Sequence, residues 1–326
     1  MDPKVRLDEV MRNYQSSIVL LSAGKVGLFA ALGERTRSAS ELAAELELDP
    51  RAIETVLLAL TADGFLEHTH TGFHISDVYV PFLLPDSPET MANILNHNHN
   101  CMRRWSVLTD VLKTGQPAPR ETEPAEGQDM RDFICGMANI SRLSSLEVVE
   151  KLDLSPFRRM LDLGGGPATS SIVFAQRYPQ LHCVVFDLPG PLTVAKEQIA
   201  AAGLADRITT RAGDFFRDDF GTGYDLVYIA NIIHSLGTAE TAQIVAKSHQ
   251  ALAAGGSLVV KDFFMADSRT EPQAAALFSV NMLVGTEQGK SYTLTETVEI
   301  LTAAGFGDFQ TVPVARASSL LMARRE

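Results

Sequence analysis

A run of glycines at the end of an apolar segment is the strongest chemical signal in the sequence. The apolar segment Leu161–Leu163 is followed by Gly164–Gly166 and then by Pro167. Glycines at a turn from strand to helix let the backbone approach a ligand that any Cβ atom would obstruct. Three adjacent glycines differ from the spaced Gly-x-Gly-x-x-Gly pattern that seats a pyrophosphate on a helix N-terminus. The residues of this turn predicted to bind a cofactor are Asp162, Gly164, Gly165 and Gly166.

Two further acidic positions follow the glycine turn. Asp187 ends the next apolar run, where a carboxylate accepts hydrogen bonds from both hydroxyls of a ribose. Asp214 and Phe215, in the segment Gly213–Phe216, offer an acid and an aromatic face for an adenine amine and ring. A glycine turn and a later acid fit NAD, FAD or S-adenosylmethionine, but Asp162 suits a ligand with a cationic amino group and sulfonium. We therefore expect S-adenosylmethionine; the alternative for Asp214 and Phe215 is a turn cap and a core residue.

A histidine follows a later apolar segment at the same end of the expected sheet. His234 lies a few residues after 225–229, where the ligands of open α/β folds bind. The pKa of an imidazole is close to neutral, so a histidine can accept a proton from a bound acceptor at neutral pH. His234 is the candidate general base, and a histidine that only lines the pocket is the alternative.

The segments that carry these residues alternate between strand and helix patterns. The strands are expected at 159–163, 182–187, 225–229 and 257–261. The helices between them are expected at 168–177, 191–202 and 239–253. This alternation specifies an α/β fold with a parallel, doubly wound sheet.

The first hundred residues have a different, mainly helical pattern. Helices are expected at Tyr14–Leu32, at Ser40–Leu48 with a capping serine, and from Pro50 to Asp63, followed by two short strands around Thr71-Gly72. This order is that of a winged-helix unit. Between residues 31 and 80 there are three Arg, no Lys and nine Asp or Glu, which argues against DNA and favours a dimerisation or substrate-lid module. We expect a homodimer, because the glycine-interrupted helix at 14–32 would leave apolar surface exposed in one subunit.

The composition and charge of the chain limit which partners and which location are expected. The chain has 326 residues and a net charge of −12, so nucleic acid is not the expected partner. Three widely spaced cysteines suggest no disulfide framework. There is no apolar run of about 20 residues and no secretory signal pattern, so we expect a soluble, cytoplasmic protein with no membrane partner.

The segment 152–326, and more loosely the whole chain, resembles the dimeric plant-type small-molecule O-methyltransferases and their bacterial relatives. The motifs that carry the resemblance are Leu161–Gly166, Phe186-Asp187-Leu188-Pro189, Gly213–Phe216, His234 and Leu252–Gly256. The resemblance implies a class I methyltransferase with a Rossmann-like sheet and an N-terminal winged-helix dimerisation domain. The domains expected are 1–100 for dimerisation, 101–150 as linking helices that contribute to the acceptor pocket, and 151–326 for the cofactor. The cofactor-binding positions implied are Asp162, Gly164, Gly165, Gly166, Asp187, Leu188, Gly213, Asp214 and Phe215.

The expected reaction moves a methyl group from S-adenosylmethionine to a hydroxyl of a small aromatic or polyketide-like metabolite, leaving S-adenosylhomocysteine. In the family two acids support the histidine; one position corresponds to Asp262, and the other falls at about Ser291, which has no carboxylate. Ser235-Leu236 replaces the usual Asp-Trp, and Ala230 replaces the usual lysine. These departures keep open an alternative reaction, C-, N- or S-methylation by proximity without a general base.

The acceptor pocket is expected to be lined by residues that in part match a family Phe and Met around the aromatic acceptor. These residues are Trp105, Phe133, Met137, Asn281 and Met282, within or near the stretch 278–284. Ordinary core packing is the alternative for each of them. His97 and Cys101 are four residues apart on a helix, but no second metal-ligand cluster accompanies them, so no metal is expected.

Overall fold

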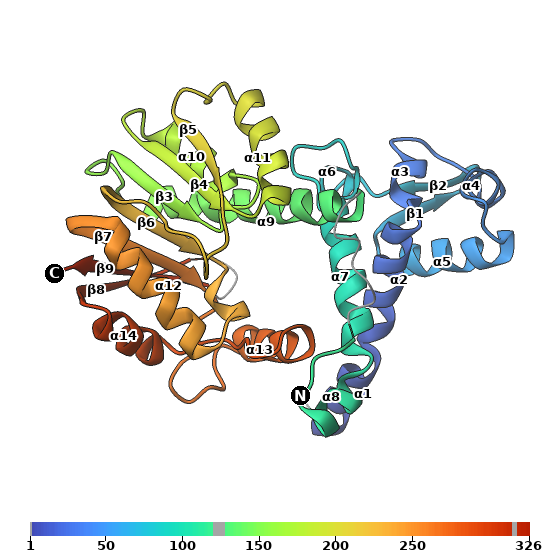
Figure 1. Ribbon diagram of the computed structural model, residues 1–326. Coiled ribbons are helices and arrows are strands. Elements are labelled where there is room, and N and C mark those ends of the chain that lie inside the picture. The colour runs from blue at the N-terminus through green and yellow to red at the C-terminus, as the bar shows by residue number, and fades with distance from the viewer. Residues whose placement is uncertain (1, 120–127, 315–317) are drawn as a thin grey trace. The chain divides into compact units, whose positions relative to one another are not determined.

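The computed structural model describes residues 2–119, 128–314 and 318–326, shown as a ribbon in Figure 1. The chain divides into two compact units, Met1–Arg103 and Arg104–Glu326. Each unit has its own hydrophobic core. Within the described ranges, no helix is both long and apolar enough to cross a membrane.

The N-terminal unit is built from short helices and one hairpin. Its elements are α1 (Pro3–Arg12), α2 (Tyr14–Lys25), α3 (Leu28–Leu32), α4 (Ala39–Leu46), α5 (Pro50–Ala62), β1 (Leu66–Thr69), β2 (Gly72–Ile75), α6 (Val80–Leu83) and most of α7 (Ala92–Trp105). Leu28, Leu32, Leu42, Leu57 and Leu60 are fully buried in its core. The helix from Pro50 and the hairpin around Thr71-Gly72 agree with the sequence prediction.

Two helices of this unit differ from the sequence prediction. The single helix expected at 14–32 is broken, because Gly27 adopts a φ of +78°, which favours glycine, and separates α2 from α3. The serine that caps α4 is Ser38 and not Ser40. The Ser38 hydroxyl accepts from the Glu41 N–H, and the Glu41 carboxylate accepts from the Ser38 N–H at 2.8 Å. This reciprocal pair satisfies two backbone donors at the helix start, so it fixes the boundary.

The C-terminal unit is a seven-stranded sheet covered by helices on both faces. Its strands are β3 (Arg159–Leu163), β4 (His182–Asp187), β5 (Ile208–Ala212), β6 (Tyr224–Ala230), β7 (Leu252–Asp262), β8 (Phe306–Pro313) and β9 (Ser319–Arg325). Its helices are α8 (Leu108–Thr114), α9 (Gln128–Lys151), α10 (Thr169–Arg177), α11 (Pro189–Ala201), the short 3-10 helix η1 (Ile233–Ser235), α12 (Thr238–Ala251), α13 (Gln273–Gly285) and α14 (Leu294–Ala303). The sheet order is β5-β4-β3-β6-β7-β9-β8. The expected strands are all present, which confirms the α/β fold class.

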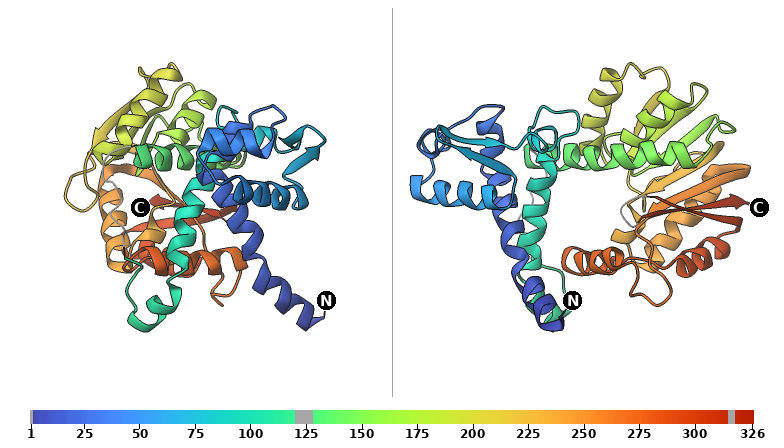
Figure 2. Two further views of the ribbon diagram at one scale, coloured as in Figure 1. Left: turned by 90° about the vertical axis from the view of Figure 1, so that its right-hand side faces the viewer. Right: turned by 180° about the vertical axis from the view of Figure 1, so that it is seen from behind.

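The sequence pattern predicted a parallel sheet, but two of the strand pairs are antiparallel. Strand β9 runs antiparallel to both β7 and β8 and lies between them. The remaining neighbours, from β5 to β7, pair in parallel. Helices α9, α10 and α11 cover one face of the sheet and α12 and α14 the other (Figure 2). Because the five parallel strands point the same way, their carboxyl ends share one edge, where the site residues lie.

Candidate active site

The glycine turn joins β3 to α10 and comes close to neighbouring side chains. Gly164 has a φ of +71°, and a Cβ atom there would lie 2.5 Å from Cδ1 of Ile232. A Cβ atom on Gly165 would lie 2.7 Å from Cγ of Asp162. Both positions therefore require glycine, one for its backbone conformation and its neighbour and the other for space. The backbone of Gly164–Gly166 therefore carries no side chain at the carboxyl end of β3, and we call this segment the cradle.

Two carboxylates lie beneath this turn with neutral partners. Asp162 is 2% exposed and accepts from the Ser171 hydroxyl at 2.6 Å. Burial raises the pKa of Asp162 to about 6, and the nearby charge of Asp187 adds to the rise. Asp187 accepts from the N–H groups of Gly166 at 2.8 Å and Leu188 at 2.7 Å, and burial raises its pKa too. Two carboxylates that are costly to ionise without a cation form a site suited to a positively charged ligand.

A small cavity of about 40 Å³ opens beside the glycine turn. Its lining includes Asp162, Gly164, Gly165, Thr169, Ala230 and Asn231. The Thr169 hydroxyl is buried, and no residue that the structure describes offers it a hydrogen bond. An unpaired buried hydroxyl is costly unless a bound group satisfies it. The cavity therefore suits a small polar group that carries a positive charge.

The Asp214 segment follows β5 at the same edge of the sheet. The Asp214 carboxylate accepts from the N–H of Phe216 at 2.8 Å, and Phe215 stacks on Phe186 with ring centroids 6.2 Å apart. The turn-cap and packing roles that the sequence left open for Asp214 and Phe215 are thus present. Leu188 is 54% exposed, so its side chain is free to cover a ligand beside Asp187.

A histidine and an aspartate from two neighbouring strand ends form a close pair. His234 Nδ1 lies 2.7 Å from Oδ1 of Asp262, the last residue of β7. The Asp262 carboxylate also accepts from the N–H of Phe263 at 2.8 Å, which fixes its orientation. The His234 ring packs edge-on against Phe278, with centroids 4.8 Å apart. The predicted pair is therefore assembled, half-enclosed by aromatic rings.

The position of the second family acid has a structural role in this chain. Ser291 is 1% exposed, and its hydroxyl donates to the Ala275 carbonyl at 2.8 Å. Its N–H donates to the Ser279 hydroxyl at 3.3 Å. Both partners belong to α13, so Ser291 anchors that helix and leaves Asp262 as the carboxylate bonded to His234.

Comparison with known proteins identifies the family. The family model of the O-methyltransferase domain matches residues 115–307. The chain is 33% identical over 302 residues to 3-hydroxy-5-methyl-1-naphthoate 3-O-methyltransferase of Streptomyces sahachiroi, covering 91% of this chain and 87% of the relative. The chain belongs to this O-methyltransferase family. It is an S-adenosylmethionine-dependent methyltransferase, which confirms the predicted family and the predicted cofactor.

Two further matches define the breadth of the similarity. L-tyrosine C(3)-methyltransferase of Streptomyces lavendulae is 30% identical over 279 residues, covering 82% of this chain and 76% of that protein. The crystal structure of human N-acetylserotonin methyltransferase in complex with S-adenosylmethionine superimposes with a TM-score of 0.89 at 24% identity, covering 100% of this chain and 98% of that chain. The structural match supports the class I methyltransferase fold.

The predicted acceptor residues of this O-methyltransferase are only partly brought together. Trp105 Nε1 donates to Oδ1 of Asn281 at 2.8 Å, so these two positions meet. Met282 is 8% exposed within α13, and Met137 is half-buried on α9. The side chain of Phe133 lies outside the residues that the structure describes.

Sequence reasoning missed several polar residues around the cofactor cradle of the methyltransferase. Ser171 and Thr169 lie on α10, and Lys261 is buried on β7 beside Asn231. The signal for Ser171 was its place on the first turns of the helix after the glycines; no residue-type pattern marked Lys261.

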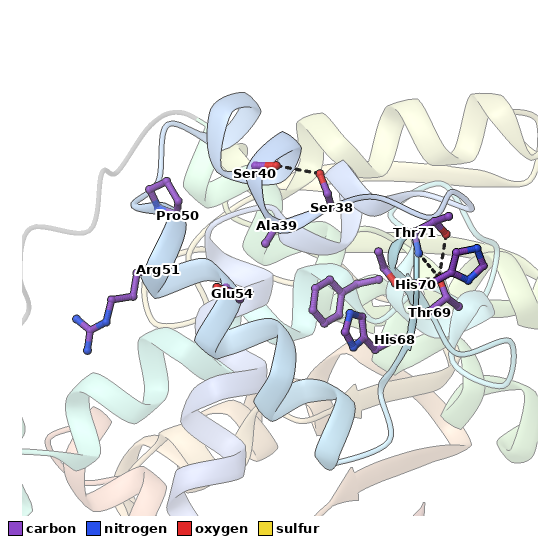
Figure 3. Close-up of a pocket in the computed structure, with 12 residues that line it drawn as sticks. Ser38, Ala39, Ser40, Pro50, Arg51, Glu54, His68, Thr69, His70 and Thr71 are labelled. Atoms are coloured by element: carbon purple, nitrogen blue, oxygen red, sulfur yellow. Dashed lines mark hydrogen bonds between the residues drawn. The ribbon is translucent and has the colours of Figure 1, made fainter.

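Two other polar features of the enzyme lie in the N-terminal unit. His97 Nε2 lies 3.4 Å from Sγ of Cys101, as their helical spacing implied. An open depression of about 490 Å³ is formed by the starts of α4 and α5 and the hairpin turn, with Arg51, His68 and His70 in its lining (Figure 3). The His68 ring stacks on Phe73 with centroids 4.3 Å apart. These side chains surround a shallow surface rather than an enclosed site.

Proposed function

We propose that this methyltransferase methylates a hydroxyl of a small aromatic or polyketide-like acceptor, with His234 as the general base. The observation that carries the proposal is the 2.7 Å contact between His234 Nδ1 and Asp262 Oδ1 at the carboxyl edge of the sheet. The Streptomyces sahachiroi relative, named for 3-O-methylation of a hydroxynaphthoate, supports the acceptor class.

The protonation of His234 follows from its partner. A carboxylate oxygen only accepts hydrogen bonds when ionised, so Asp262 selects the tautomer with the proton on Nδ1. The lone pair of Nε2 is then available to accept the proton of an acceptor hydroxyl. Asp262 also stabilises the imidazolium that results, since the pair is largely shielded from water. The sulfonium of S-adenosylmethionine supplies the electrophilic methyl group when it is bound.

We propose cofactor contacts for the residues in and around the cradle. Asp187 holds the ribose hydroxyls, and Gly164–Gly166 with Asp162 receive the methionine end. Gly213, Asp214 and Phe215 face the adenine, beside Leu188. Trp105, Phe133, Met137, Asn281 and Met282 shape the acceptor pocket. The cavity with its unpaired Thr169 hydroxyl supports the placement of the methionine end.

The test is the substitution of His234 by alanine, assayed with a hydroxynaphthoate as acceptor. Loss of a general base is expected to lower kcat about 100-fold or more. Affinity for S-adenosylhomocysteine, measured by calorimetry, should stay within about threefold, since His234 lies outside the cavity lining. Asp206→Asn, at an exposed position, is the matched control and should change neither quantity.

Two results would contradict the proposal. An unchanged kcat in His234→Ala would remove His234 from the mechanism and leave methyl transfer by proximity. A product whose NMR spectrum shows the new methyl on carbon would replace O-methylation with C-methylation, the reaction named for the Streptomyces lavendulae relative.

We also propose that the enzyme is a homodimer formed through its N-terminal unit. Part of the predicted apolar surface is present, since Tyr14, Ile18 and Val26 are 57%, 36% and 44% exposed, whereas Leu28, Phe29 and Leu32 are buried inside the unit. Helix α1 adds to this surface, because it buries none of its residues and its Leu7 and Val10 are 60% and 62% exposed. Apolar side chains gathered on one exposed helix favour a second copy as their partner.

The mass in solution tests the dimer. Light scattering after size-exclusion chromatography should give twice the 35.4 kDa chain mass at micromolar concentration. Val10→Glu should lower that mass towards one chain, whereas Arg6→Glu on the same helix should not. A monomer for the unaltered protein would refute the dimer. The domains proposed with it are 1–100 for dimerisation, 101–150 for the acceptor pocket and 151–326 for the cofactor.

A further inference from the structure

A buried lysine lies beside the cofactor cavity and has no role in the mechanism above. Lys261 is 4% exposed, although it carries an ammonium group at the edge of the sheet. Its Nζ lies 3.4 Å from Oδ1 of Asn231, a residue that lines the cavity. One long hydrogen bond to a neutral amide compensates little of the cost of burying a cation.

The register of the sheet places this side chain next to residues that line the cavity. Ala230 of β6 and Lys261 of β7 are paired neighbours in parallel strands, so their side chains project from the same face. Ala230 lines the cavity, and its side chain is a single methyl group. Asn231 adopts a φ of +58°, a conformation that asparagine tolerates better than most residues, and its amide meets Lys261.

Nearby acids do not fully neutralise the lysine. Asp262 is bonded to His234, and Glu147 forms an ion pair with Lys151 at 2.7 Å. Both charges favour the ammonium form, but burial outweighs them and lowers the pKa of Lys261. A further anion close to Nζ would restore the charged form.

We propose that Lys261 binds the α-carboxylate of the methionine end of S-adenosylmethionine, with Asn231 holding the ammonium in place. The inference rests on the proposed placement of the methionine end in this cavity. That end carries an ammonium and a carboxylate, and the Asp162 carboxylate in the cavity lining can attract only the ammonium. Lys261 supplies the opposite charge from β7, the strand paired with Ala230 of β6.

The experiment compares two ligands and three proteins by calorimetry. The ligands are S-adenosylhomocysteine and its decarboxylated analogue, 5′-S-(3-aminopropyl)-5′-thioadenosine. The unaltered enzyme should bind the first about 10- to 100-fold more tightly, as expected for a charge-assisted hydrogen bond. Lys261→Met should lose that preference and bind both ligands within about threefold of each other. Lys113→Met, at a lysine that is 71% exposed, should keep the preference.

The outcomes separate this inference from the proposed function. If Lys261→Met retains the preference for the carboxylate, the role of Lys261 is refuted while the cofactor site stands. If the unaltered enzyme does not bind S-adenosylhomocysteine, both are refuted. If Lys261 had only a structural role, Lys261→Met would lower the melting temperature of the free enzyme and leave the preference for the carboxylate unchanged. Should Lys261→Met not fold, Lys261→Gln, whose amide can still bond to Asn231, gives the same comparison.

Discussion

Replacing Asp162 by asparagine should make the free enzyme more stable and bind its cofactor less well. In the folded protein burial raises the pKa of Asp162 from 3.8 to about 6. The carboxyl group is therefore more easily protonated in the folded state, and ionisation above pH 6 opposes folding. Its contribution to stability is fully present below about pH 4 and is lost as the pH rises through 6.

The size of the effect follows from the two pKa values. A difference of about 2 units at 1.36 kcal/mol per unit corresponds to about 3 kcal/mol of stability at pH 8. At pH 5 only part of the titration is complete, so the gain should be about half as large. Asparagine has the same shape and keeps an oxygen that can accept from the Ser171 hydroxyl, so the substitution removes mainly the charge.

The assay is urea unfolding followed by circular dichroism at pH 8 and pH 5, without ligand. Asp206→Asn, at an exposed aspartate of the same unit, should stay within about 0.5 kcal/mol at both values. Calorimetry should show weaker binding of S-adenosylhomocysteine by Asp162→Asn at pH 8. The assignment would be refuted if Asp162→Asn were less stable than the unaltered enzyme at pH 8, or if its gain in free energy of unfolding were the same at both pH values. Either result would mean that burial does not destabilise the ionised carboxylate of Asp162.

Two other substitutions follow from the packing. Gly165→Ala places a Cβ atom 2.7 Å from Cγ of Asp162, so affinity for S-adenosylhomocysteine should fall about tenfold or more by calorimetry, and unchanged affinity would show that the turn is not part of the cradle. Leu57→Ala removes a fully buried side chain from the N-terminal core and should cost about 2–5 kcal/mol in urea unfolding. Leu58→Ala, one residue on and 47% exposed, is its control and should cost far less.

The parts of the site predictable from the sequence were those carried by local motifs. The glycine turn, Asp187 and His234 each follow an apolar segment, and parallel strands bring segment ends to one edge. Asp262 was predicted through the family resemblance, and its contact with His234 spans two neighbouring strands. Such positions can be predicted from the order of strands and helices alone, and the spacing of apolar residues along the sequence indicates that order.

Other features depend on packing that periodicity does not encode. Periodicity alone does not separate Ser38 from Ser40 as the cap of α4, because both precede an amphipathic run; the signal that could have done so is Glu41, three residues after Ser38. Helix α1 has polar and apolar residues but no buried position, so it left no core pattern to read. The role of Lys261 depends on the register between β6 and β7, which sets which side chains are neighbours.

The antiparallel strand β9 has a consequence for the order in which the sheet assembles. Strand β8 precedes β9 in the chain but is not paired with β7, since β9 lies between them. The two can form a hairpin locally, yet only β9 can attach to the rest of the sheet. Until it does, β7 has an unpaired edge that ends at Asp262, and open edges attract other chains. Slow docking of this hairpin would expose newly made enzyme to aggregation. A cofactor bound at the proposed site, at the carboxyl end of β3, would not cover the open edge of β7, because β6 lies between the two strands.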